Sequence, residues 1–111
     1  MPNKRRAALA FQAVYYSVTG AWPLFSRRTF EAVTGPKSDW WLVQMVGLLA
    51  FTNGAAIGSS LRNPPPEIVR LSLLSAFSFA AIDIVYTASG RISPVYLADA
   101  AVELVIAAFV A

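Results

Sequence analysis

The sequence predicts an all-α fold: an integral membrane four-helix antiparallel bundle, formed by a single domain over residues 1–111. The chain is 57% hydrophobic and only 14% charged, with a mean hydropathy of +0.56, whereas soluble domains are typically about 25% charged. A short soluble fold leaves a large share of its residues exposed and cannot hide so much apolar surface. The apolar residues also fall into four runs separated by turn-forming segments. We therefore expect lipid to be the solvent of these helices.

The first predicted span covers residues 7–25 and follows a basic tail that contains Lys4, Arg5 and Arg6. A basic tail before an apolar run is also typical of a secretory signal peptide. The run shows no clear small-x-small cleavage pattern, so we favour a retained helix. Pro23 is expected to kink or end this helix.

The second predicted span covers residues 40–61 and opens with Trp40 and Trp41, a pattern typical of the membrane–water interface. At 1.5 Å per residue it reaches about 33 Å, enough to cross a bilayer. A polar connector with a Gly-Pro turn precedes it. We expect a short interfacial helix in this connector, around residues 29–33.

The third predicted span covers residues 67–89 and the fourth covers residues 94–111. Three consecutive prolines, Pro64–Pro66, cannot continue a helix and separate the second span from the third. Because this link is short, these two spans are expected to form an antiparallel hairpin. Ser93 can cap the fourth span, whose first residue is then Pro94.

Basic residues indicate the orientation of the bundle. With a cytoplasmic N-terminus, the two sides carry unequal numbers of basic residues, which weakly favours cytoplasmic N- and C-termini. The inner set is Lys4, Arg5, Arg6, Arg62 and Arg70, and the outer set is Arg27, Arg28, Lys37 and Arg91. These residues flank apolar runs and form no continuous stripe, so the expected partner is the lipid bilayer and no nucleic-acid binding is expected.

Three acidic residues, Asp83, Asp99 and Glu103, lie inside the predicted spans. A carboxylate in hydrocarbon costs ~2.5–3.5 kcal/mol on insertion scales, so such residues usually mark a site, an ion path or an internal bond. Helical rise places Asp83 about 10 Å from the end of its span, and Asp99 about 7–8 Å into the next. Glu103 follows Asp99 by four residues and shares its helix face. The three carboxyls can therefore meet at a similar depth.

Tyr15, Tyr16 and Gln44 are expected at the same level as the acids. The functional hypothesis is a polar pocket in which these six residues bind or move a proton, a cation or a small apolar or cationic ligand. The structural alternative is that one acid bonds Tyr15, Tyr16 or Gln44 across helices while Arg91 neutralises another. Both interpretations stay open at this point.

Small residues in the second span, Gly47 and the Gly54-x-x-x-Gly58 spacing, permit close helix packing within the bundle or between protomers. A homo-oligomer or a larger membrane complex is therefore a further expected partner.

The chain has no cysteine and no histidine. The lack of cysteine excludes disulfides and thiol nucleophiles. The lack of both residues excludes zinc sites and haem ligation by cysteine or histidine, and the lack of histidine excludes a Ser–His–Asp triad. No cofactor or metal site is expected. Carboxyls suited to acid–base chemistry are present, but there is no nucleophile motif or nucleotide-binding loop. Enzymatic activity therefore ranks behind ligand handling and behind a non-catalytic accessory role.

The chain resembles the small four-helix bacterial membrane proteins of the DoxX-like group. The resemblance rests on size, on four spans and on the stretches Tyr15-Tyr16-Ser17-Val18-Thr19-Gly20, Phe30-Glu31-Ala32-Val33-Thr34-Gly35 and Ile92-Ser93-Pro94-Val95-Tyr96-Leu97-Ala98-Asp99. The architecture is also similar to a wider set that includes sterol isomerases, which use a histidine that this chain lacks. The resemblance implies a bacterial inner-membrane location, a ligand cavity lined by Asp83, Asp99 and Glu103, and an accessory role in an oxidase or redox assembly.

Overall fold

The computed structural model describes residues 2–111, and this part of the chain is all-helical with no strand. The predicted fold class is therefore confirmed at the level of secondary structure. The helices are α1 (Pro2–Phe25), α2 (Arg27–Thr34), α3 (Trp40–Gly58), α4 (Pro66–Ala88) and α5 (Tyr96–Val110).

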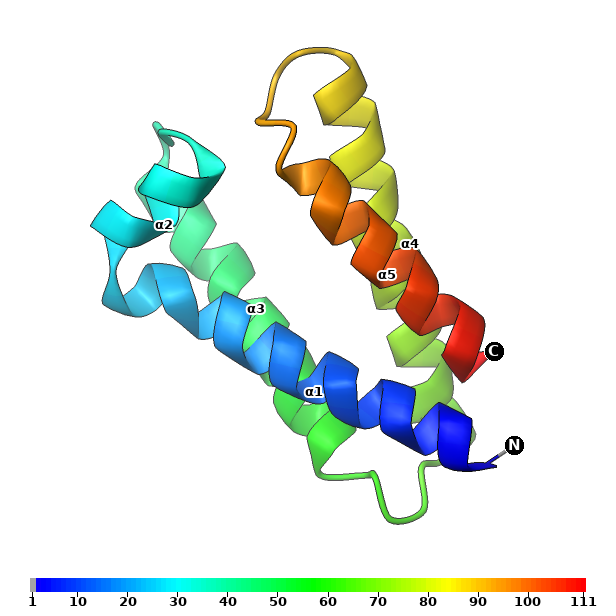
Figure 1. The fold of residues 1–111 in the computed structure, drawn as a ribbon. Coiled ribbons are helices and arrows are strands. Elements are labelled where there is room, and N and C mark those ends of the chain that lie inside the picture. The colour runs from blue at the N-terminus through cyan, green and yellow to red at the C-terminus, as the bar shows by residue number, and fades with distance from the viewer. Residues whose placement is uncertain (1) are drawn as a thin grey trace.

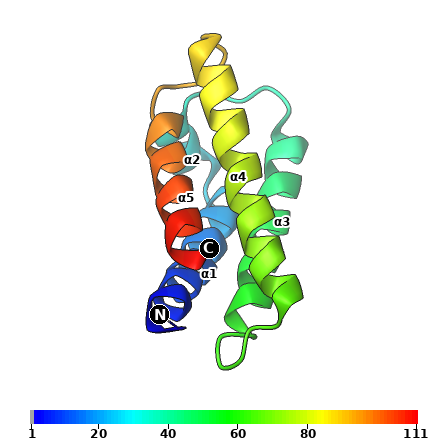
Figure 2. The same ribbon diagram turned by 90° about the vertical axis from the view of Figure 1, so that its right-hand side faces the viewer.

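The four long helices run alternately in opposite directions, so both termini and the α3–α4 link lie at one end of the molecule (Figures 1 and 2). This end is called the terminal end below. The helices form two close pairs, α1 with α3 and α4 with α5. The pairs meet toward the terminal end and diverge toward α2 and the α4–α5 link (Figure 1).

Several helix boundaries differ from the predicted ones. α1 begins at Pro2, five residues before the expected start, and α4 begins and ends one residue early. α3 ends at Gly58, short of residue 61, because the hydroxyls of Ser59 and Ser60 both donate to the Ala56 carbonyl, at 2.9 and 3.1 Å. Such local bonds compete with continuation of the helix. α5 begins at Tyr96, two residues after the expected start.

The start of α5 is delayed by a turn over residues 94 and 95. The Ser93 hydroxyl accepts a hydrogen bond from the Val95 backbone N–H at 3.3 Å, so it stabilises this turn and not the first turn of the helix. Pro23, which was expected to kink or end the first helix, lies inside α1, and α1 ends two residues later at Phe25.

The short helix expected around residues 29–33 is present as α2. Its first turn is capped by Ser26, whose hydroxyl accepts a hydrogen bond from the Thr29 backbone N–H at 3.3 Å. Gly35, at φ +95°, ends the helix in a conformation that side chains disfavour. The Phe30 ring packs edge-on against Trp22 and Trp40, with ring centroids 5.3 and 5.9 Å apart, and this anchors α2 between α1 and α3.

Glycines bring α1 and α3 into very close contact. A Cβ added at Gly54 would lie 2.6 Å from Ser17 Oγ and 2.8 Å from the Ala13 carbonyl oxygen, and one at Gly47 would lie 2.5 Å from the Gly20 carbonyl oxygen. The small-residue stripe of α3 therefore serves packing within the chain. At Gly58 the added Cβ would lie 3.5 Å from Ala13 Cβ, an ordinary contact distance.

The hairpin expected from the second and third spans is formed only in part. α3 and α4 are joined antiparallel by the Pro64–Pro66 link, but they contact each other little, and α3 packs mainly on α1. The glycines explain this choice, because they allow a closer approach to α1 than larger side chains would permit elsewhere.

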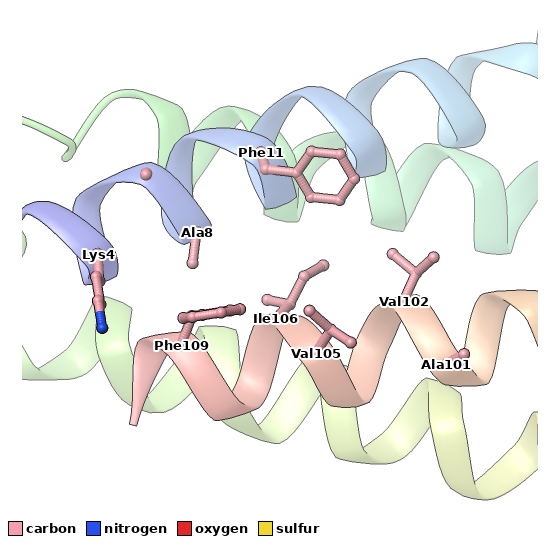
Figure 3. A pocket seen from close by; sticks show the side chains of 9 residues that line it. Lys4, Ala8, Phe11, Ala101, Val102, Val105, Ile106 and Phe109 are labelled. Atoms are coloured by element: carbon pink, nitrogen blue, oxygen red, sulfur yellow. The ribbon is translucent and has the colours of Figure 1, made fainter.

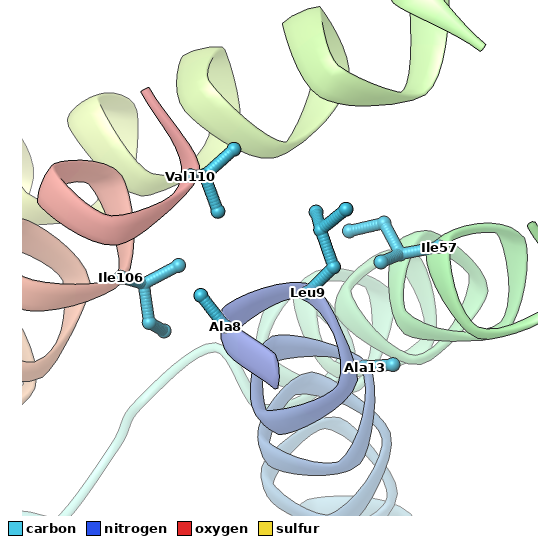
Figure 4. Close-up of a cluster of buried hydrophobic side chains, with 6 residues drawn as sticks. All are labelled: Ala8, Leu9, Ala13, Ile57, Ile106 and Val110. Atoms are coloured by element: carbon cyan, nitrogen blue, oxygen red, sulfur yellow. The ribbon is translucent and has the colours of Figure 1, made fainter. Parts of the chain in front are cut away.

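An apolar cluster joins the two pairs toward the terminal end, with α1 in the middle (Figure 4). Leu9, Ile57 and Val110 are completely buried in it. Its members are Ala8, Leu9, Ala13, Ile57, Ile106 and Val110.

Two of the five helices, α3 and α4, are long and apolar enough to cross a membrane. α5 has only 15 residues, and α1 carries more polar side chains. The structure thus supports two membrane-spanning helices by length and composition, and the four-span bundle stays a prediction.

Candidate functional site

Two tyrosine–carboxyl hydrogen bonds connect α1 to α5. The Tyr16 hydroxyl donates to Glu103 Oε1 at 2.7 Å, and the Tyr15 hydroxyl donates to Asp99 Oδ1. Asp99 and Glu103 are one helical turn apart on α5, so they face the adjacent tyrosines of α1 together. Tyr16 and Glu103 are almost completely buried, at 1% and 2% exposure, whereas Tyr15 and Asp99 are half-buried.

Asp83 adds a third carboxyl from α4. Its side chain is buried and interacts with both Asp99 and Glu103. Asp99 is the acidic neighbour that interacts most strongly with Asp83 and with Glu103. The structure therefore brings the three acids together from two helices, as the depth argument predicted. We refer to Tyr15, Tyr16, Asp83, Asp99 and Glu103 as the acid–tyrosine cluster.

One fully buried oxygen of the cluster lacks a hydrogen-bond donor among the described residues. Asp83 Oδ2 is buried and receives no hydrogen bond from the described residues. Thr87 follows by one helical turn on α4, and its buried hydroxyl is also without a partner there. A buried polar atom without a partner is costly, so this position is the one best suited to accept a proton or a donor from outside the chain.

No basic side chain in the described part of the chain forms an ion pair with the cluster. Within residues 2–111, the ion pair found is Arg27 Nε with Glu31 Oε1, at 3.4 Å on α2. Arg91, expected to neutralise one of the acids, is exposed and forms no such pair in this part of the chain. The described acids are also not grouped in a way that could hold a metal ion.

Gln44 does not join the cluster. It is half-buried on α3 and forms no hydrogen bond with the other five predicted residues in the described structure. α3 packs on the α1 face that carries Ala13, Ser17 and Gly20, whereas the carboxyls contact the neighbouring face with the two tyrosines. The structural alternative predicted hydrogen bonds from an acid to Tyr15 or Tyr16, and these bonds are present. The contacts of the acids with Gln44 and Arg91 that it also allowed are not found in the described structure.

A second polar layer lies closer to the terminal end. The Gln12 side chain is completely buried and donates to the Ser72 carbonyl oxygen at 3.1 Å, while the Ser72 hydroxyl donates back to Gln12 Oε1. On the neighbouring helices, Asn53 Nδ2 donates to Ser75 Oγ at 3.1 Å. These bonds connect α1 and α3 to α4. The signal in the sequence is an amide within an apolar run, Gln12 in the first predicted span and Asn53 in the second.

Two cavities lie elsewhere in the molecule. One, of about 550 Å³, lies between α1 and α5, and the other, of about 650 Å³, lies at the terminal end. Neither is lined by a member of the acid–tyrosine cluster. The cluster is thus an internal hydrogen-bonded network and does not form the wall of either cavity.

No family model, curated protein or solved structure matches this chain.

Proposed function

We propose that this chain is a membrane protein whose acid–tyrosine cluster binds and exchanges a proton within the bilayer. The observation that carries this proposal is the meeting of Asp83, Asp99 and Glu103 without a basic partner among the described residues. Proton binding is the form of ligand handling that the geometry favours, because neither cavity reaches the cluster and its acids are not grouped as metal ligands.

The distribution of side chains supports a bilayer setting. Large apolar side chains point outward along all four long helices, for example Val14, Leu48, Phe77 and Val105, each more than half exposed. Polar side chains such as Gln12 and Glu103 are buried instead. A soluble protein normally shows the opposite arrangement of large apolar patches and polar groups. We infer that all four long helices lie in lipid, with α2 at the interface.

The chemistry of proton exchange follows from proximity. Three carboxyls within reach of one another repel strongly when all are ionised, and the low dielectric of a bilayer increases the repulsion. A proton shared among them relieves this repulsion, and the cluster then titrates as a unit. The tyrosine hydroxyls hold one oxygen of Asp99 and one of Glu103 in place. Asp83 Oδ2, which receives no hydrogen bond in the described structure, is the oxygen at which we propose that the proton enters or leaves.

A second candidate is a non-catalytic accessory subunit of a larger, redox-linked membrane complex, the role that the DoxX-like resemblance implies. One observation favours it: the Tyr15–Asp99 and Tyr16–Glu103 bonds join the two helix pairs, as purely structural bonds would. In that case the chain is recovered with partner subunits after gentle extraction and native mass measurement. Recovery only as a free chain counts against this candidate.

Infrared spectroscopy of the reconstituted protein tests the proton proposal. We expect a protonated-carboxyl C=O band at neutral pH that decreases as the pH rises and is reduced in both Asp83→Asn and Glu103→Gln. Glu67→Gln, at an exposed position in the first turn of α4, is the matched control and should leave the band unchanged. An identical band in all four proteins, with helix content preserved by circular dichroism, would overturn the proposal.

A further inference from the structure

An apolar groove runs between α1 and α5 on the outer surface near the terminal end (Figure 3). Its volume is about 550 Å³. Phe11 lines it from α1, and Val102, Val105 and Phe109 line it from α5. The one charged residue among those that line it is Lys4, at the end of the groove nearest the termini (Figure 3).

A basic cavity of about 650 Å³ adjoins this groove, and Lys4 and Phe109 line both. Lys4, Arg5, Arg6 and Arg62 contribute its four positive charges, and no acidic side chain lines it.

Two of the arginines are held in place by backbone oxygens. Arg5 Nε donates to the Val110 carbonyl oxygen at 2.7 Å, and an Arg6 guanidinium nitrogen donates to the Arg62 carbonyl oxygen at 2.9 Å. The guanidinium groups keep further N–H donors for a ligand, since each has five. Lys4 is exposed and forms no hydrogen bond with the rest of the described chain.

We propose that an anionic phospholipid binds here, with its phosphate in the basic cavity and one acyl chain in the groove. The lining residues match both parts of such a molecule, because an apolar groove adjoins a cavity lined by four basic side chains. Basic pockets between membrane helices commonly bind anionic headgroups, and Lys4 has the flexible stem needed to reach a phosphate at the interface. This inference rests on the membrane setting of the proposed function and not on its proton chemistry.

Native mass spectrometry of the full chain from phosphatidylcholine nanodiscs containing phosphatidylglycerol tests the headgroup site. We expect retained phosphatidylglycerol in preference to phosphatidylcholine. Near a membrane surface each basic residue is worth about fivefold in affinity, so Lys4→Gln with Arg62→Gln should lower retention by roughly 25-fold. Arg28→Gln with Arg91→Gln removes the same charge at the opposite end and should have little effect. Equal loss in both double variants would show non-specific charge attraction and overturn the proposal.

A second arm tests the groove and separates a lipid from a free anion. Ala101→Phe fills the groove from α5 and should reduce retention severalfold with all basic residues intact, whereas Ala81→Phe, exposed on α4 away from the groove, should not. Inorganic phosphate and glycerol phosphate, added at the same concentrations as the lipid, should fail to displace it. Displacement by phosphate alone, or no effect of Ala101→Phe, would overturn a lipid site. Asp83→Asn should bind lipid normally, so failure of the proton proposal is distinguishable from failure of this one.

Discussion

The Tyr16 hydroxyl on α1 donates a hydrogen bond of 2.7 Å to Glu103 Oε1 on α5, and both side chains are almost completely buried. This bond joins one member of each helix pair near the middle of the molecule. The Tyr16 ring also packs edge-on against Phe79 of α4, with ring centroids 5.4 Å apart. Tyr16 therefore contacts both helices of the second pair.

Tyr16→Phe should destabilise the fold, because it removes the donor and leaves a buried carboxyl oxygen without a partner. The expected loss is about 1–3 kcal/mol in the free energy of unfolding, measured by detergent-induced unfolding followed by circular dichroism. Tyr86→Phe makes the same chemical change at an exposed position of α4. It should cost less than about 0.5 kcal/mol, the usual range for surface substitutions. Equal losses in the two variants would contradict this role for Tyr16.

Gly54→Ala should separate α1 from α3, because the added Cβ would lie 2.6 Å from Ser17 Oγ and 2.8 Å from the Ala13 carbonyl oxygen. Overpacking of this kind typically costs about 1–3 kcal/mol. Gly58→Ala is the control on the same helix, since its Cβ would meet Ala13 Cβ at 3.5 Å. The free energy of unfolding should be clearly lower for Gly54→Ala than for Gly58→Ala. The reverse order would contradict the close packing of α1 on α3.

The link between α2 and α3 should loosen at acidic pH. The Lys37 backbone N–H donates to Glu31 Oε2 at 2.7 Å, and this bond, together with the nearby Arg27 guanidinium, lowers the pKa of Glu31 below its ordinary value of 4.5. Because the folded pKa is lower than the unfolded one, the stabilisation is present above pH 4.5 and is lost as the pH falls from there through the folded pKa.

Hydrogen exchange at the Lys37 amide, corrected for intrinsic rates, measures this effect. Protection should fall below pH 4.5 in the native chain, whereas in Glu31→Gln, whose amide oxygen accepts a hydrogen bond but does not titrate, protection should change little over the same range. Glu67→Gln, at the opposite end of the molecule, should behave like the native chain. A pH dependence that survives in Glu31→Gln would assign the effect to another group.

The absence of cysteine allows a direct test of the membrane setting by spin labelling of single-cysteine variants. Labels at Phe77→Cys and Leu48→Cys, at outward positions near the middle of α4 and α3, should collide more often with oxygen than with a water-soluble nickel complex. A label at Ser38→Cys, in the α2–α3 link, should show the opposite preference. Equal access of the nickel complex to all three labels would contradict insertion of α3 and α4.

Local features allowed much of the secondary structure to be predicted. The Pro64–Pro66 run and the Gly-Pro turn interrupt the helical pattern, so the ends of α3 and α4 lie within a few residues of the predicted bounds. The meeting of Asp83 with Asp99 was also predictable, because helical rise and an antiparallel turn determine depth. Depth alone does not determine which helix faces meet, so it does not reveal that Gln44 lies outside the cluster.

The amino-acid sequence by itself determined the helices, the turns and the level of each acid, because these depend on residues close together in the chain. Only the tertiary structure decided that α3 packs on α1 through Gly47 and Gly54, that Tyr15 and Tyr16 are the donors to Asp99 and Glu103, and that Lys4 lies where an apolar groove meets a basic cavity. Those relationships depend on how helices rotate and approach one another, and that is settled by side-chain volume and by hydrogen bonds between residues far apart in the sequence.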